Sequence, residues 1–194
     1  MEKVFEFRNG KVRVTYNEPG KIQGFEEKYV SASVQRNTRK CTSVYSVGVE
    51  AMAHTGGRMC YGKLSVSVRP QKEADKINIT IAVTEENTVK FRNSLLLDDS
   101  YVYCGLPEEY VELMLDCVAN AIEAVETFPQ CTLFFEEAAN CEAGSSSMYF
   151  GGIAELLVRM IEKENAADIF FMSEKEFAEH FFKGEGAGRL CLAL

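Results

Sequence analysis

The order of its hydrophobic periodicities is the feature of this 194-residue sequence that most constrains its fold. Up to residue 84, apolar residues mostly alternate with polar ones, as in half-buried β-strands, and from residue 106 they recur mainly at helical spacing. Asn9-Gly10 between the first two alternating runs predicts a type I′ hairpin turn, because both residues tolerate positive φ. Strands followed by helix–strand–helix predict an α+β two-layer sandwich. The strands expected in the first part are residues 4–8, 11–16, 29–36, 43–53, 62–68 and 76–84.

The second part of the sequence predicts three helices. The first, residues 106–126, has Pro107 near its start and an apolar stripe from Tyr110 to Val125. The second runs from a cap within residues 145–147 to about residue 165, and Ser173-x-x-Glu176 is a capping box that opens a last helix to about residue 183. The other segments are an irregular stretch at 85–103, a strand at 131–135, a loop at 138–144, a short strand at 168–172, a flexible stretch at 184–188 and an apolar tail at 190–194.

Charge and composition exclude several classes of function. The formal net charge is −8, from 21 Lys and Arg against 29 Asp and Glu, which argues against a broad DNA-binding surface and against docking on anionic lipid. The seven cysteines form no C-x-x-C pair, and residues 1–6 have no apolar leader, so we expect a cytoplasmic protein with reduced thiols. No apolar run approaches the length of a membrane span.

The motifs of common enzymes are absent. Neither the phosphate-binding loop of nucleoside triphosphatases nor the glycine fingerprint of dinucleotide-binding folds occurs, and two distant histidines offer few metal ligands. Gly144-Ser145-Ser146-Ser147 lacks the second glycine of a nucleophile elbow, so these serines are better explained as helix caps. Cys141 has no histidine near it in the sequence. We therefore predict no catalytic, metal or cofactor site, and expect a protein that is not an enzyme.

Residues 54–62, which read H-T-G-G-R-M-C-Y-G, are the most distinctive stretch. One interpretation is a glycine-bulged hairpin that returns Tyr61 to the core. The other is an exposed loop tip that presents His54 and Arg58 to a partner. Composition alone favours the first interpretation.

This stretch resembles a loop in the fourth domain of elongation factor G and its relatives, including the tetracycline-resistance ribosomal protection proteins. The family loop has the form S-G-G-R-x-x-Y-G with a proline nine positions after the tyrosine, as Pro70 is here. Two further blocks agree in order: residues 106–111 resemble I-P-x-E-Y-[IV], with residues 91–93 upstream resembling F-x-N on the family's preceding strand, and residues 128–129 resemble Y-P. Residues 140–150 take the place of the family's second loop, but Cys141 replaces its histidine and Gly144 its acidic residue. At the first tip, His54 stands where the family often has glutamine.

The resemblance covers about residues 29–165 and implies the two-layer fold of the second domain of ribosomal protein S-five, as in elongation factor G domain IV. Outside it we expect an N-terminal β-hairpin appendage at residues 1–28 and a C-terminal βα extension at residues 166–194. The resemblance also implies two loop tips that contact a partner. The first consists of His54, Thr55, Gly56, Gly57, Arg58 and Tyr61, and the second of Asn140, Cys141, Glu142, Ser145 and Ser146.

In the parent factors this domain mimics the anticodon arm of tRNA and reaches the decoding centre of the ribosome. The chain is therefore expected to be a stand-alone, non-enzymatic module without the GTPase, which binds the ribosome, rRNA or a translation-related protein and needs no cofactor. An acidic body suits a mimic of RNA. Two alternatives stay open: a homo-oligomeric assembly protein that uses the hairpin and the apolar tail, and an enzyme or small-molecule-binding protein on the same scaffold.

Overall fold

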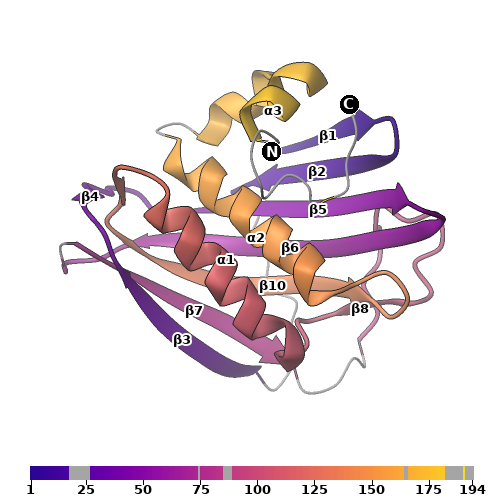
Figure 1. Ribbon diagram of the computed structural model, residues 1–194, viewed down its shortest axis with the longest axis horizontal. Coiled ribbons are helices and arrows are strands. Elements are labelled where there is room, and N and C mark those ends of the chain that lie inside the picture. Colours follow the sequence, from indigo (N-terminus) through magenta and orange to yellow (C-terminus); the bar gives the residue numbers. More distant parts are fainter. Residues whose placement is uncertain (18–26, 74, 85–88, 164–165, 182–189, 191–194) are drawn as a thin grey trace.

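The protein is built from one large sheet with two long helices on one face (Figure 1). The computed structural model describes residues 1–17, 27–73, 75–84, 89–163, 166–181 and 190. Within them the eight-stranded sheet has the order β1-β2-β5-β6-β10-β7-β3, and β8 pairs with β10. Its strands are β1 (Glu2–Phe7), β2 (Gly10–Tyr16), β3 (Glu27–Gln35), β5 (Tyr45–Thr55), β6 (Arg58–Pro70), β7 (Lys76–Thr84), β8 (Val102–Cys104) and β10 (Cys131–Cys141).

The other elements are short strands and helices that complete an α+β structure. A second, two-stranded sheet pairs β4 (Thr38–Arg39) with β9 (Phe128–Pro129). The helices are α1 (Val111–Glu123), α2 (Ser147–Glu162) and α3 (Glu174–Phe181), with 3₁₀ turns at η1 (Glu108–Tyr110) and η2 (Ala166–Phe171). The predicted α+β class is confirmed. None of the described helices is both long and apolar enough to cross a membrane.

Alternation along the strands separates the two faces of the sheet. In β5, Val47, Val49 and Ala51 are buried in the same core cluster as Phe150 and Ile153 of α2. The intervening positions point to the opposite face, which is polar over much of its area. A bulge between Phe135 and Glu137 of β10 allows both Glu136 and Glu137 to bond to side chains of β6 on that face: Glu136 to Ser67 and Arg69, and Glu137 to Lys63 and Ser65.

The predicted loop at residues 138–144 is wrong for its first four residues. Ala138 to Cys141 continue β10, which pairs with both β6 and β8, and the turn begins only at Glu142. Small and polar residues suggested a loop, but all four are buried in the strand. Ala138 belongs to the main core, whereas Ala139 and Cys141 belong to a second cluster. The partly buried side chains of Phe91 and Leu96, from the loop before β8, pack against this second cluster. Cover on both faces removes the alternation by which a strand is recognised.

The predicted helices are found, with shorter bounds. The stripe expected at residues 106–126 is α1, preceded by the 3₁₀ turn η1, so Pro107 lies before the helical turns. Ser146 caps α2 by accepting a hydrogen bond from the Tyr149 N–H. The capping box is confirmed, since the Ser173 N–H donates to the Glu176 carboxylate at 2.7 Å and the Glu176 N–H donates to Ser173 Oγ at 3.3 Å.

The strand predicted at residues 168–172 is wrong, because η2 occupies Ala166–Phe171. This segment is bonded to β1 through a side chain: Lys3 Nζ donates to the carbonyl oxygen of Phe170 in η2 and to that of Met172, which follows η2. The predicted features at residues 182–183, 184–188 and 191–194 lie outside the described residues. Leu190, the first residue of the predicted apolar tail, is buried in the main core.

The N-terminal hairpin forms, but its turn differs from the prediction. Phe7 pairs with Gly10, so the two turn residues are Arg8 and Asn9, and neither Asn9 nor Gly10 has positive φ. Gly10 also pairs with Ala53 of β5, so it is a strand residue between two partner strands rather than a turn residue. Because β2 pairs with β5 along its whole length, the hairpin extends the main sheet.

The two segments outside the family resemblance pack against each other. The rings of Phe5 in β1 and Phe177 in α3 are stacked with their centroids 4.1 Å apart, and the ring of Phe7 is tilted against that of Phe177 at a centroid distance of 6.4 Å. Figure 1 shows α3 above β1 and β2, at the edge of the sheet that α1 and α2 do not cover. The C-terminal helix therefore covers the N-terminal hairpin.

Gly105, at the end of β8, supports the region where β8, β10 and η1 meet. Its φ is +113°, and a Cβ there would lie 2.2 Å from Thr84 Oγ1. We expect Gly105→Ala to lower the free energy of unfolding by about 2–4 kcal/mol through backbone strain and overlap. Gly57→Ala is the matched control, since Gly57 has a φ of +78° but open space around it and should cost only about 1 kcal/mol. If denaturant titrations showed equal losses in the free energy of unfolding for the two variants, this explanation would be wrong.

Candidate functional site

The first predicted tip is the tight turn between β5 and β6. Thr55 pairs with Arg58, so Gly56 and Gly57 form a two-residue turn, with φ of +54° and +78°. Such a turn matches the twist of the strands and needs residues that tolerate positive φ. The side chains of His54, Thr55 and Arg58 are exposed, whereas Tyr61 is fully buried. Each interpretation of this sequence is correct in part: Tyr61 is buried, and His54 and Arg58 are exposed to solvent. The expected glycine bulge is absent, because the register of β5 and β6 is continuous up to the turn.

The second predicted tip is the turn from β10 into α2, and it is bound to the first. The Tyr61 N–H donates to the Gly144 carbonyl at 3.0 Å. Ser145 Oγ accepts a hydrogen bond from the Cys141 N–H and donates one to the Tyr61 carbonyl, both at 2.8 Å. The residues that the sequence assigned to two separate loops therefore meet at one end of β6.

The predicted residues of the second tip divide into exposed and buried ones. Glu142 and Ser146 are exposed and Ser145 is half-buried, but Asn140 and Cys141 are 2% and 3% exposed. The Asn140 side-chain amide donates to the Gly105 carbonyl at 3.0 Å. Asn140, Cys141 and Tyr61 thus support the tips from inside rather than forming their surface. The Ser145 hydroxyl holds the turn together, and the Cys141 thiol is buried.

A third turn, which the prediction of two tips did not include, lies beside the first tip. The His54 N–H donates to the Asn9 carbonyl at 2.7 Å, and the Asn9 side-chain amide donates to the His54 carbonyl at 3.3 Å. This contact brings the β1–β2 turn, with exposed Arg8, next to His54. We call residues 8–10, 54–58 and 142–145 together the tip surface. Figure 1 shows the β1–β2 turn, the β5–β6 turn and the β10–α2 turn at the same end of the sheet.

Charge is distributed unevenly over this end. Arg8 and Arg58 are exposed cations on the two hairpin turns. Beyond Glu142 lies an acidic hollow of about 640 Å³, lined by Thr84, Asn140, Glu142 and residues 107–110, among them Glu108 and Glu109. A guanidinium at the tip can donate paired hydrogen bonds to a phosphate or stack on a base.

A buried carboxylate fixes the tip surface from below. Glu50 of β5, 2% exposed, accepts hydrogen bonds from the Tyr61 hydroxyl at 2.9 Å, from Arg13 Nη1 at 2.8 Å and from the Leu95 N–H at 2.6 Å. Arg13 Nη1 also donates to the Asn93 carbonyl at 2.8 Å. The carboxylate thereby joins β2, β5, β6 and the loop that precedes β8.

The sequence did not single out Glu50, Arg13 or Arg8. Alternation in β5 places Glu50 on the face away from the helices, where a carboxylate would ordinarily be solvated. What buries it is the loop at residues 89–101, whose irregular sequence gives no periodic signal. Among the described residues, no group of three His, Cys, Asp or Glu side chains is placed to hold a metal ion.

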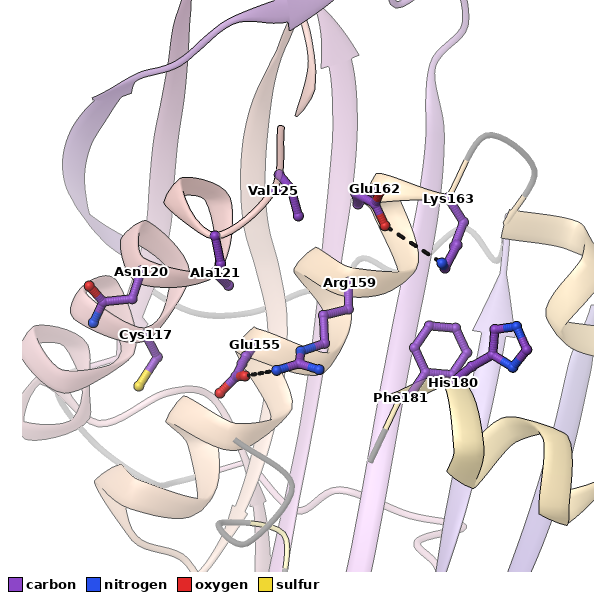
Figure 2. A pocket seen from close by; sticks show the side chains of 11 residues that line it. Cys117, Asn120, Ala121, Val125, Glu155, Arg159, Glu162, Lys163, His180 and Phe181 are labelled. Carbon is purple, nitrogen blue, oxygen red and sulfur yellow. Dashed lines mark hydrogen bonds and ion pairs between the residues drawn. The ribbon is translucent and has the colours of Figure 1, made fainter. Parts of the chain in front are cut away.

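A cleft of about 540 Å³ lies between α1, α2 and α3, away from the tip surface (Figure 2). Arg159 bonds to Glu155 one helical turn earlier at 2.6 Å, and Lys163 lies 3.8 Å from Glu162. Figure 2 shows His180 and Phe181 of α3 opposite Cys117 and Asn120 of α1 across these pairs. The pair of Glu155 and Arg159, at i and i+4, is of a kind common on helix surfaces. The described contacts do not connect this cleft with the tip surface.

The carboxylate of Glu50 should make a large contribution to stability. We expect Glu50→Ala to lower the free energy of unfolding by about 2–4 kcal/mol, because three donors lose their acceptor inside the protein. The control is Glu6→Ala, which removes the exposed ion pair with Lys11 and should change stability by about 0.5 kcal/mol or less. Urea titrations of both variants measure this, and similar small losses would show that Glu50 does not hold the region together.

Glu50 should also give stability a distinct pH dependence. Burial raises the pKa of Glu50 above its usual value, and the hydrogen bonds only partly oppose this. A carboxyl whose pKa is higher in the folded state stabilises most below its unfolded pKa, and this contribution is lost as the pH rises through the folded pKa. The stability of the wild type relative to Glu50→Gln should therefore fall from pH 4 upward and then level off. A difference that grows with pH would contradict this.

No family model, no curated protein and no solved structure matches this chain.

Proposed function

We propose that the chain is a non-enzymatic binding module that docks on the ribosome, through rRNA or a ribosome-bound partner, by its tip surface. The observation that carries the proposal is the convergence of the turns: both loops expected to contact a partner lie at one end of the sheet and are hydrogen-bonded to each other. The proposal also draws on the sequence resemblance to the fourth domain of elongation factor G, whose fold class the α+β sandwich matches.

The topology agrees with that resemblance in part: residues 91–93, which resemble a motif on a strand of the family, lie in the loop between β7 and β8. The segments resembling the family supply β5, β6, α1, β10 and the start of α2, which form the centre of the two-layer sandwich. We propose the finer fold, that of the second domain of ribosomal protein S-five, on this basis. The two additions at residues 1–17 and 166–181 lie at one edge of this centre, where the hairpin adds Arg8 to the tip surface.

The tip surface is built to be rigid, which favours binding. A two-residue turn allows Gly56 and Gly57 few backbone conformations. The second turn is hydrogen-bonded to β6 through its backbone and through Ser145. A surface that is ordered before binding loses less conformational freedom on docking. Its exposed arginines suit phosphate groups, while the net charge of −8 keeps the rest of the chain from binding nucleic acid indiscriminately.

Co-sedimentation with ribosomes tests the proposal. We expect the wild type to sediment with purified ribosomes and Arg58→Ala to bind about tenfold more weakly, as expected when charge-assisted hydrogen bonds to phosphate are lost. The binding should weaken as salt is raised.

The matched control is Lys72→Ala, which removes one positive charge from an exposed residue beyond the other end of β6. Its binding should equal that of the wild type. If the wild type never sediments with ribosomes, the proposal fails; if both variants weaken binding equally, net charge rather than the tip surface is responsible.

A further inference from the structure

Two cysteines far apart in the sequence come into register next to the small sheet. β4 and β9 run parallel, with Thr38 opposite Phe128 and Arg39 opposite Pro129. The Gln130 N–H donates to the Arg39 carbonyl at 2.8 Å, as expected for the parallel pair of Arg39 and Pro129. Continuing this register by two residues places Cys41 opposite Cys131, the first residue of β10.

Other observations agree that these two thiols are neighbours. Both are free, Cys131 is buried in the main core, and half-buried Cys41 packs against that same core. Cys41 acts electrostatically on Cys131, and both act on Tyr45, raising the pKa of each affected group in addition to the effect of burial. The energy of such an effect grows as the separation of the two groups falls.

The geometry fits a covalent bond. Opposite residues on paired strands lie about 4.8 Å apart, inside the range of Cα separations that disulfides span. We propose that Cys41 and Cys131 are a redox modification site, which a small-molecule disulfide such as oxidised glutathione converts into an intramolecular disulfide bond.

The reaction is two successive thiol–disulfide exchanges. Cys41, the more accessible thiol, loses its proton and its sulfur attacks one sulfur of glutathione disulfide, so that one glutathione leaves as thiolate and takes up a proton. The deprotonated sulfur of Cys131 then attacks the Cys41 sulfur, and the second glutathione leaves in the same way. Two protein thiols are oxidised to one disulfide, and one glutathione disulfide is reduced to two glutathione molecules.

The bond would join the connection between β3 and β5 to the start of β10. It would close a loop from residue 41 to residue 131, and cross-links that close long loops restrict the unfolded chain strongly. The oxidised protein should therefore unfold at a higher temperature. Because burial raises the pKa of both thiols, the exchange should speed up as the pH rises.

The test is to incubate the reduced full chain with glutathione disulfide and to map its cysteines by mass spectrometry without reduction. The expected product has lost two hydrogens, carries no glutathione and yields a cross-linked peptide pair containing Cys41 and Cys131. Glutathione retained on Cys41 without the cross-link, or a cross-link between other cysteines, would overturn the proposal.

Cysteine variants test whether the cross-link joins Cys41 and Cys131. Cys41→Ser should abolish the cross-link and the rise in melting temperature, whereas Cys117→Ser, which removes a buried thiol of α1, should leave both unchanged. Cys131→Ser alters a fully buried position and is informative only if it folds; the map of the wild-type protein decides the question in either case.

Discussion

The carboxylate of Glu50 is the interaction on which one whole end of the structure depends. It accepts hydrogen bonds from a side chain of β2, a side chain of β6 and the backbone of the loop before β8. A buried carboxylate is unfavourable unless such donors surround it. Arg13, Tyr61 and the loop before β8 are therefore linked through one shared acceptor.

The effect of this arrangement extends to the surface. Tyr61 is the residue whose backbone N–H and carbonyl bind the β10–α2 turn, and its side chain is held by Glu50. The exposed turns are thus attached to a buried polar cluster through one tyrosine. Next to the first tip, the sheet is covered by helices on one face and by the loop before β8 on the other. The strands that carry the tip surface therefore have little freedom to move.

Much of this architecture could be predicted from the sequence, and the failures have physical causes. Half-buried strands and amphipathic helices can be predicted from the spacing of their apolar residues. For this reason β5, β7, α1 and α2 were expected near their observed positions. Ala138 to Cys141 were expected as a loop because a strand covered on both sides has no alternation. Gly10 was expected in a turn, but it is a strand residue that pairs with Phe7 and Ala53. Glu50 was overlooked because its burial comes from an irregular loop, which no local pattern foretells.

The stacking of Phe5 on Phe177 bears on how the protein acquires its structure during synthesis. The first strand is made early, but its covering ring belongs to a helix that follows about 170 residues later. Until that helix leaves the exit tunnel, β1 exposes phenylalanine at the edge of a growing sheet, where another chain could pair with it. Closure of this edge is a contact of very long range and hence slow. Nascent chains of this protein should consequently rely on chaperones most in the interval before residue 177 emerges.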